Sequence, residues 1–188
     1  MTERYTATNF YAGLVVWWRF SVERAMSFVW RMRMLAHNTY VGPGARIIGG
    51  RRLQFGAGVI IQKDAVLAAG PNGVIRLGQR SRIGHSAILS AHELIEIGED
   101  VLIADRTFIA DHNHKFDDIT RPVMAQGGTS PDPVKIGRGS WLGVNVCILG
   151  GVQLGEHCVV GANSVVTKSF GSYSVVAGIP ACLIRKLK

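Results

Sequence analysis

The sequence predicts an all-β parallel β-helix, in which short strands and turns wind into stacked triangular coils. Two observations carry this prediction. An aliphatic residue recurs every six residues, and the residue after it is usually Gly or Ala. Glycine is also abundant, with 23 residues against 6 prolines, and the glycines recur at intervals instead of clustering in a linker. A fixed short period of this kind is the sequence signature of a solenoid.

The aliphatic positions form groups of three. In chain order they are Phe55, Ile61 and Leu67; Leu77, Ile83 and Leu89; Ile97, Ile103 and Ile109; Ile136, Leu142 and Ile148; Leu154, Val160 and Val166. One hexapeptide cannot bury its aliphatic side chain alone, but stacked coils place each such residue on the next, about 4.8 Å away. Glycine at the second position meets the turn, where positive φ or close backbone approach excludes larger residues. We therefore expect about five to six triangular coils over residues 41–180.

Interruptions of the repeat follow only the third hexapeptide of a group. They comprise residues 73–76, 95–96 and 115–135, and we expect each to leave the coil at the same corner. The stretch 115–135 is polar and contains proline, and long loops in an economical fold usually exist to make a site. The sequence thus predicts one long functional loop.

The two ends of the chain differ from the repeat. Residues 1–40 are expected to form an N-terminal helical segment, with a helix from about residue 12 to residue 35. Five charges in that helix argue against a membrane-spanning segment. It either packs on the coil or on a neighbouring subunit, or it lies in a membrane interface with its basic residues near lipid phosphates. Residues 181–188 are expected to form a basic C-terminal tail.

The net charge of +8 and the pI of about 9.9 favour a polyanionic partner. The chain contains no signature of a known nucleic-acid-binding motif, so a nucleic-acid partner is not expected. The 3 cysteines form no CxxC pair, which favours a reduced protein. With no recognisable secretory signal, we expect the cytoplasm, or the inner face of the membrane if the N-terminal helix meets lipid.

Two histidines precede the long loop, in the sequence Ile109-Ala-Asp-His-Asn-His114. Attack by an alcohol at neutral pH needs a base, and histidine is the side chain that titrates in this range. His112 occupies the fourth position of its hexapeptide, as His92 does one coil earlier, so we expect these two rings to stack at one corner. His114 lies where the chain departs. The plain alternative is that His112 and His114 are merely solvent-exposed corner residues.

The C-terminal half carries the most specific motifs. Residues 161–168 read Gly-Ala-Asn-Ser-Val-Val-Thr-Lys, and residues 177–181 read Ala-Gly-Ile-Pro-Ala. This half resembles the hexapeptide-repeat acyltransferases, especially the maltose, galactoside and polysaccharide O-acetyltransferases. The resemblance implies a left-handed helix, acetyl-CoA as co-substrate, no metal, and a homotrimer with sites between subunits. Aligned without gaps from Ile97, the family's catalytic histidine falls on His114, which therefore ranks above His112.

The same resemblance implies contacts to both substrates. For coenzyme A it places Trp141 beside the pantetheine arm, Gly143, Val144, Ala162 and Thr167 along the coil wall, and Lys168 and Arg185 near the phosphates. Trp141 as a core or interface aromatic and Lys168 as a solvated charge remain alternatives. For the acceptor it implies His85, His92, Asp111 and His112. Gly84 and His92 replace an Asn and an Asp of the galactoside enzymes, so we expect a sugar unit of lipopolysaccharide or capsule instead of a simple galactoside.

The predicted reaction is direct transfer of an acetyl group from acetyl-CoA to a sugar hydroxyl, with His114 as general base. Backbone N–H groups near Gly143 are the expected donors to the oxyanion, and Asp111, Asp117 or a backbone carbonyl is expected to orient the imidazole. Two alternatives stay open. The β-helix can be a scaffold or lectin-like module without turnover, or a γ-class carbonic anhydrase-like enzyme that binds zinc through histidines such as His85 and His92.

Overall fold

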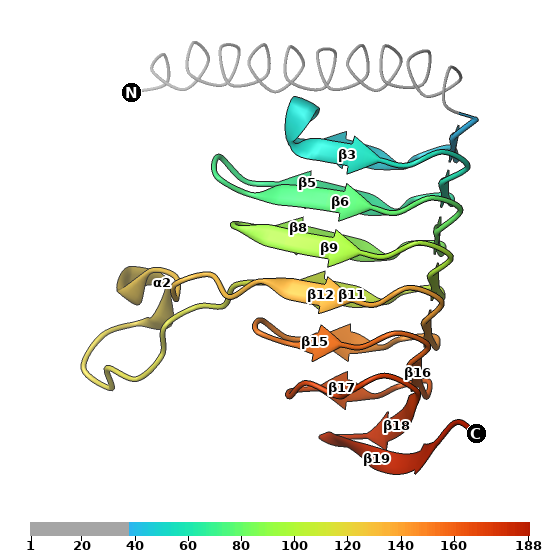
Figure 1. The fold of residues 1–188 in the computed structure, drawn as a ribbon. Coiled ribbons are helices and arrows are strands. Elements are labelled where there is room, and N and C mark those ends of the chain that lie inside the picture. Colours follow the sequence, from blue (N-terminus) through green and yellow to red (C-terminus); the bar gives the residue numbers. More distant parts are fainter. Residues whose placement is uncertain (1–37) are drawn as a thin grey trace, which may run out of the picture.

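A computed structural model describes residues 38–188, and the N-terminal helix expected before residue 36 lies outside this part. The described chain winds into a parallel β-helix whose strands form three sheets (Figure 1). Sheet A contains β1 (Tyr40–Val41), β4 (Ile60–Ile61), β7 (Arg82–Ile83), β10 (Leu102–Ile103), β13 (Trp141–Leu142), β16 (Val159–Val160), β18 (Ser174–Gly178) and β19 (Ala181–Lys186). Sheet B contains β2 (Arg46–Ile48), β5 (Val66–Ala69), β8 (Ile88–Ala91), β11 (Phe108–Ala110), β14 (Cys147–Ile148) and β17 (Val165–Val166). Sheet C contains β3 (Leu53–Phe55), β6 (Val74–Leu77), β9 (Leu94–Ile97), β12 (Val134–Ile136) and β15 (Gln153–Leu154).

The core is the column of aliphatic residues that the hexapeptide period predicts. All of the predicted first-position residues are buried except Phe55, which is half-buried at the N-terminal end. They pair level by level, as Ile83, Ile103 and Leu142 do along sheet A. Sheet A has parallel strands from β1 to β18, which mark about seven turns, slightly more than the five to six expected. The all-β parallel β-helix is therefore confirmed.

Glycine and positive φ occupy different positions of the hexapeptide. A Cβ added to Gly78, a second-position glycine, would lie 2.5 Å from the backbone nitrogen of Glu99 in the next coil. Positive φ occurs instead two residues later, for example at Arg80 (56°) and Asn145 (58°). Neighbouring coils approach closely at second positions such as Gly78, which favours glycine there, and the fourth position supplies the left-handed residue of the turn.

The two short interruptions do not leave the coil, and this part of the prediction is wrong. Ile75 of β6 and Ile95 of β9 are fully buried and pair with each other in sheet C. Leu53 and Val134 extend this second apolar column at either end. The residues that interrupt the six-residue period therefore lengthen the strands of sheet C. Each of these strands points a second aliphatic side chain into the core.

The long interruption does leave the body, and it projects sideways between β11 and β12 (Figure 1). It includes the short helix α2 (Val123–Gln126). Its own side chains hold it together: Asp118 Oδ1 accepts hydrogen bonds from the N–H and hydroxyl of Thr120, and the Gln126 amide donates to the Asp118 carbonyl at 2.9 Å. The expected loop is thus an ordered arm of the molecule.

The ends of the described chain are simple. A 3-10 turn, η1 (Gly50–Arg52), precedes β3. Residues 181–186, expected as part of a basic tail, form β19, which pairs antiparallel with β18 and closes the last coil. Within the described part, no helix is long and apolar enough to span a membrane.

Candidate functional site

His92 and His112 stack at the corner between sheets B and C, as the coil register predicts. Their ring centroids are 3.5 Å apart and their planes differ by 3°. His112 Nδ1 lies 3.0 Å from Asp111 Oδ1. The His112 side chain is 23% exposed, whereas that of Asp111 is fully buried. The sequence-predicted residues His92, Asp111 and His112 therefore form one cluster.

The carboxylate of Asp111 replaces carbonyl groups that the departing chain does not supply. One level earlier, the N–H of Val74 donates to the carbonyl oxygen of Glu93 at 2.8 Å. At the next level the chain leaves the coil after Asp111. The N–H groups of His92, Glu93 and Leu94 donate to the two Asp111 carboxylate oxygens instead, at 2.8, 2.7 and 2.8 Å. A buried acid is stable here because each of its oxygens accepts hydrogen bonds.

These contacts also set the charge of Asp111. Burial by itself would raise the pKa of this carboxyl, because it disfavours the charged form. The backbone donors of His92, Glu93 and Leu94, together with the His112 ring, outweigh burial and hold the pKa below its ordinary value. Asp111 is therefore a carboxylate at neutral pH and accepts hydrogen bonds only.

His114 lies at the base of the arm with an exposed side chain. Its backbone is fixed where the two ends of the arm meet, because His114 forms an antiparallel bridge with Gly128. The N–H of Lys115 donates to the carbonyl of Gly127 at 3.0 Å, and that of Thr129 to the carbonyl of Asn113 at 2.8 Å. The ring is accessible to a substrate while its backbone is held.

Thr167 and Lys168 lie at the same corner as the histidine cluster. Ile109, Ile148 and Val166 pair in consecutive strands of sheet B. Lys168 therefore follows β17 as Asp111 follows β11, two strands away, or about 10 Å at ordinary strand spacing. Both Thr167 and Lys168 are exposed, and Lys168 Nζ lies 5.8 Å from the centre of the Phe170 ring.

The remaining predicted coenzyme contacts lie on sheet A or at its ends. Trp141 projects outward from β13 and is 49% exposed, so it is not a core residue. Val144 and Ala162 occupy successive coils at the corner between sheets A and B, and Arg185 is exposed on β19. The N–H of Gly143 already donates to the carbonyl of Val160 at 2.9 Å, so an oxyanion donor would have to be a neighbouring N–H.

One chain does not bring all the predicted residues together. Trp141 and the histidine cluster lie on different sheets of the triangular coil. His85 lies at the corner between sheets A and B, where its N–H donates to Asp105 at 2.8 Å, apart from the other histidines. In residues 38–188 no group of three or more His, Cys, Asp or Glu side chains is arranged to hold a metal ion.

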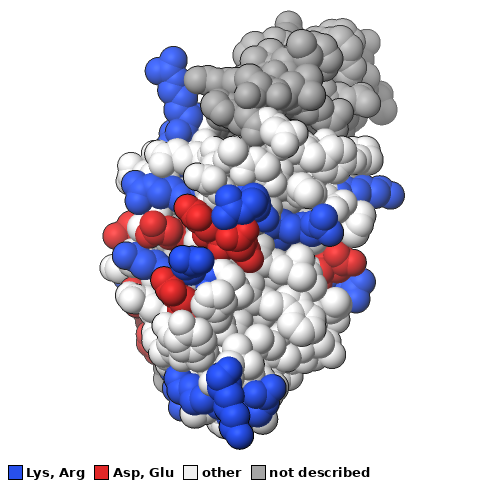
Figure 2. All heavy atoms as spheres, turned by 45° about the vertical axis from the view of Figure 1, so that its right-hand side comes forward, with Lys and Arg blue, Asp and Glu red and all other residues white. Residues whose placement is uncertain are grey.

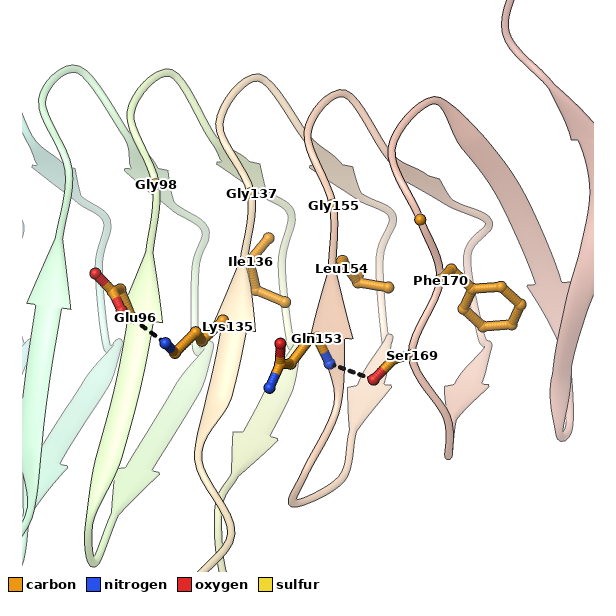
Figure 3. A pocket seen from close by; sticks show the side chains of 11 residues that line it. Glu96, Gly98, Lys135, Ile136, Gly137, Gln153, Leu154, Gly155, Ser169 and Phe170 are labelled. Carbon is orange, nitrogen blue, oxygen red and sulfur yellow. Dashed lines mark hydrogen bonds and ion pairs between the residues drawn. The ribbon is translucent and has the colours of Figure 1, made fainter.

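A surface hollow of the described chain lies away from these residues. It is an open depression of about 650 Å³ on the outer face of sheet C, and none of the predicted site residues lines it. Figure 3 shows Lys135 directed at Glu96, and the N–H of Gln153 donates a hydrogen bond to the hydroxyl of Ser169. These polar groups of the hollow therefore already have partners within the chain. The histidine corner is the better candidate for acyl transfer, because it has imidazoles that can act as bases near neutral pH, whereas the hollow has none. A site formed between subunits would not appear as a cavity of one chain.

Charge is unevenly distributed along the β-helix. Figure 2 shows Lys and Arg mixed with Asp and Glu over the middle coils, and a cluster of Lys and Arg at the C-terminal end. In that last coil Arg185, Lys186 and Lys188 are exposed. An anionic ligand that extends along the coils would meet net positive charge at this end.

Sequence reasoning missed the residues that hold the arm in place. The N–H of Asp132 donates to the Asp111 carbonyl at 2.7 Å, and Thr129 Oγ1 accepts from the N–H of Asn113 at 3.1 Å. Their side-chain types gave no signal of this role. Asp111 lies just before the loop, but this position in the sequence does not by itself reveal that both ends of the arm bind to it.

Comparison with known proteins identifies the family. Residues 133–168 match the family described as bacterial transferase hexapeptide (six repeats). The putative lipopolysaccharide biosynthesis O-acetyl transferase WbbJ of Escherichia coli K12 is 37% identical over 139 residues, which cover 70% of this chain and 68% of that protein. The probable acetyltransferase Rv3034c of Mycobacterium tuberculosis is 38% identical over 113 residues, and the match spans only 37% of its length.

A solved structure agrees with this result. The hexapeptide-repeat acetyltransferase VCA0836 of Vibrio cholerae, in complex with acetyl coenzyme A, superposes with a TM-score of 0.61 at 25% identity. The match covers 88% of this chain and 78% of that one. Because the repeat, the coil and a relative matched over two thirds of its length agree, the chain belongs to the bacterial hexapeptide-repeat acyltransferase family.

Proposed function

We propose that the protein is an acetyl-CoA-dependent O-acetyltransferase that modifies a sugar hydroxyl of a surface polysaccharide or its precursor, with His114 as general base. The observation that carries this proposal is the corner between sheets B and C. It combines an exposed histidine at the base of an ordered arm with Thr167 and Lys168 two strands away on the same edge. A base at this corner and a cation further along the same sheet edge suit a thioester at one end of the corner and anionic groups at the other.

The chemistry of the surface between these points fits coenzyme A. Cys147 and Val165 are half-buried and face outward from sheet B, which gives the pantetheine arm a weakly polar wall. Lys168 and Arg185 are exposed cations that match phosphate groups. The complex of VCA0836 with acetyl coenzyme A supports the same co-substrate.

The reaction needs no covalent intermediate on the protein. Acetyl-CoA supplies the acetyl thioester. His114 removes the proton of the acceptor hydroxyl as its oxygen attacks the carbonyl carbon, the carbon–sulfur bond breaks, and the imidazolium returns the proton to the thiolate of coenzyme A. Atoms and charges balance without a further reactant.

Accessibility favours His114 over His112 as the base. The His112 ring is stacked on His92 and its Nδ1 contacts Asp111. One ring face and one ring nitrogen are therefore not available to a substrate. The ring of His114 is exposed. His112 stays the second candidate, because a histidine oriented by a buried carboxylate is also a normal arrangement for a base.

The acceptor class rests on the relatives and on the polar character of the corner. WbbJ is named for lipopolysaccharide biosynthesis, which supports a sugar unit of a surface polysaccharide. His92, His112 and Asp111 are the acceptor-side residues that lie together, and their ring nitrogens suit hydroxyl groups. His85 would reach the same acceptor only from another subunit.

Exposed apolar side chains support a homotrimer with sites between subunits. Leu102 and Trp141 on sheet A are exposed at the level of the arm. Ile119 and Met124 on the arm are 98% and 95% exposed. A rotation about an axis parallel to the β-helix keeps each coil at its height, so the arm of one copy can reach Leu102 and Trp141 of the next. Such an arrangement would unite His114 and Trp141.

Steady-state assay of the His114→Ala variant tests the function. Release of the free thiol with candidate nucleotide-sugars and glycans should fall by at least a hundredfold, within the range of a lost general base. The His112→Ala variant should retain more activity. Near-normal transfer by His114→Ala would exclude this base, and a selective loss in His112→Ala would move the role to His112.

Two further measurements separate the rival functions. Calorimetry should detect binding of acetyl-CoA, and its absence would favour a scaffold or lectin-like module. Metal analysis of the purified protein addresses the carbonic anhydrase alternative, in which His85, His92, His112 and His114 of adjacent subunits would bind zinc. Stoichiometric zinc would favour that alternative.

A further inference from the structure

The carboxylate of Asp111 connects the preceding coil to the start of the arm. Its two oxygens accept hydrogen bonds from the N–H groups of His92, Glu93 and Leu94 in the preceding coil. One of them also lies 3.0 Å from His112 Nδ1 on the departing segment. Removal of this carboxylate therefore affects the preceding turn and the start of the arm together.

The backbone of Asp111 also holds the returning end of the arm. Its carbonyl oxygen accepts a hydrogen bond from the N–H of Asp132 at 2.7 Å. The carbonyl of Asp132 then accepts from the N–H of Gly151 in the following coil at 2.9 Å. Both ends of the arm thus meet at Asp111, and His114 lies three residues beyond it.

The contact with His112 fixes the position of a proton. Because Asp111 is ionised and can only accept, the contact at 3.0 Å requires hydrogen on His112 Nδ1. In the neutral ring this leaves the lone pair on Nε2. His92 stacks on the same ring and prevents it from rotating freely. The ring therefore has one tautomer and one orientation.

We propose that Asp111 is a positioning residue of the acetyl-transfer site, which holds His112 in a single tautomer and fixes the two ends of the arm that carries His114. The role rests on the proposed function, since it acts through the histidines assigned there. Asp111 itself does not touch either substrate. A displacement of a reacting group by about 1 Å can cost about a hundredfold in rate, so a residue that sets this geometry influences kcat.

The Asp111→Asn variant tests the proposal. An amide nitrogen would face the N–H groups that the carboxylate accepts, so the turn and the arm should shift. We expect kcat to fall at least tenfold while KM for acetyl-CoA changes less than twofold, because Thr167 and Lys168 follow a different strand. Unchanged kcat in a folded Asp111→Asn protein would overturn the proposal.

Asp105→Asn is the matched control. Asp105 also accepts a backbone N–H from the preceding coil, that of His85 at 2.8 Å, but at the corner between sheets A and B. Its kcat and KM should remain within about twofold of the native values. An equal loss of kcat in Asp105→Asn would show that any weakened coil turn reduces activity, and it would overturn a specific role for Asp111.

A double variant tests whether Asp111 acts through His114. In the His114→Ala background, Asp111→Asn should reduce kcat by less than threefold, because the group it positions is already absent. A full additive loss would contradict the proposal. Normal transfer by His114→Ala alone would remove His114 as the base, and this outcome is distinguishable because the kcat of the Asp111→Asn variant is measured separately.

Nuclear magnetic resonance of the native protein provides a readout that does not depend on activity. Long-range ¹H–¹⁵N spectra of the histidine side chains, with His112 assigned from a His112→Gln sample, should show hydrogen on Nδ1 at neutral pH. Hydrogen on Nε2 instead would overturn the proposal whatever the activity data show.

Discussion

His112 lies face to face with His92 from the preceding coil, with 3.5 Å between ring centroids. Loss of one ring should destabilise the corner. We expect His92→Ala to lower the free energy of unfolding by about 0.5–1.5 kcal/mol, the usual contribution of a stacked aromatic pair. His92→Phe, which keeps a flat ring, should recover most of the loss. Urea unfolding measures both, and equal losses in the two variants would show that stacking does not stabilise this corner.

The stabilisation by Asp111 should depend on pH in a defined direction. The pKa of Asp111 is lower in the folded protein than its ordinary value, so the folded state favours the carboxylate. Such a group contributes stability above its unfolded pKa of about 3.9, and the contribution is lost as pH falls through the folded pKa. The Asp111→Asn variant should be less stable than the native protein by about 1–3 kcal/mol at pH 7.

Urea unfolding of both proteins between pH 7 and pH 3 checks this dependence. The difference between them should shrink as the solution becomes more acidic, because the native carboxyl then becomes neutral. A difference that stays constant down to pH 3 would contradict the charged state assigned to Asp111.

The sequence predicted the parts of this molecule that follow one period. The aliphatic residues that recur every six positions form the core, with only Phe55 half-buried, and the same six-residue period correctly predicted that His92 stacks on His112. The prediction from this period failed where one strand has two side chains directed into the core. Ile75 and Ile95 are such second residues, and because they do not fit the six-residue period they look like insertions in the sequence. The contacts of Asp111 were also inaccessible, because backbone N–H groups have no sequence signature. A site formed between subunits is equally hard to predict, because the sequence of one chain does not show which surfaces meet.

Close approach of adjacent coils should make second-position glycines hard to replace. A Cβ at Gly78 would lie 2.5 Å from backbone atoms of both Gly98 and Glu99, which cannot move independently of the coil. We expect Gly78→Ala to cost about 1–3 kcal/mol or more, as other overpacked cores do. Gly171→Ala is the control, because the nearest atom to its Cβ would be Lys186 Nζ at 3.8 Å. Equal melting temperatures for the two variants would contradict the steric explanation.

The apolar arm should stabilise the assembly more than the single chain. Ile119 and Met124 are almost fully exposed, so replacing both by Ser should leave the fold of one chain intact. If they pack on Leu102 and Trp141 of a second copy, the double variant should dissociate at a higher protein concentration. Sedimentation velocity over a dilution series measures this change. Ile179→Ser, at the C-terminal end and also exposed, should not alter the assembly.

The cation at the histidine corner should affect binding of the coenzyme and not the chemical step. Lys168 is exposed about two strands from Asp111, too far to touch the reacting carbonyl but suitably placed for a phosphate. Lys168→Ala should raise KM for acetyl-CoA about tenfold with kcat nearly unchanged, which is the pattern of a group that binds substrate and transition state equally. The effect should shrink at high salt, where charges are screened.

Lys63→Ala is the control. It removes an exposed lysine paired with Asp64 and should change neither constant. A fall in kcat without a change in KM would instead place Lys168 beside the reacting groups.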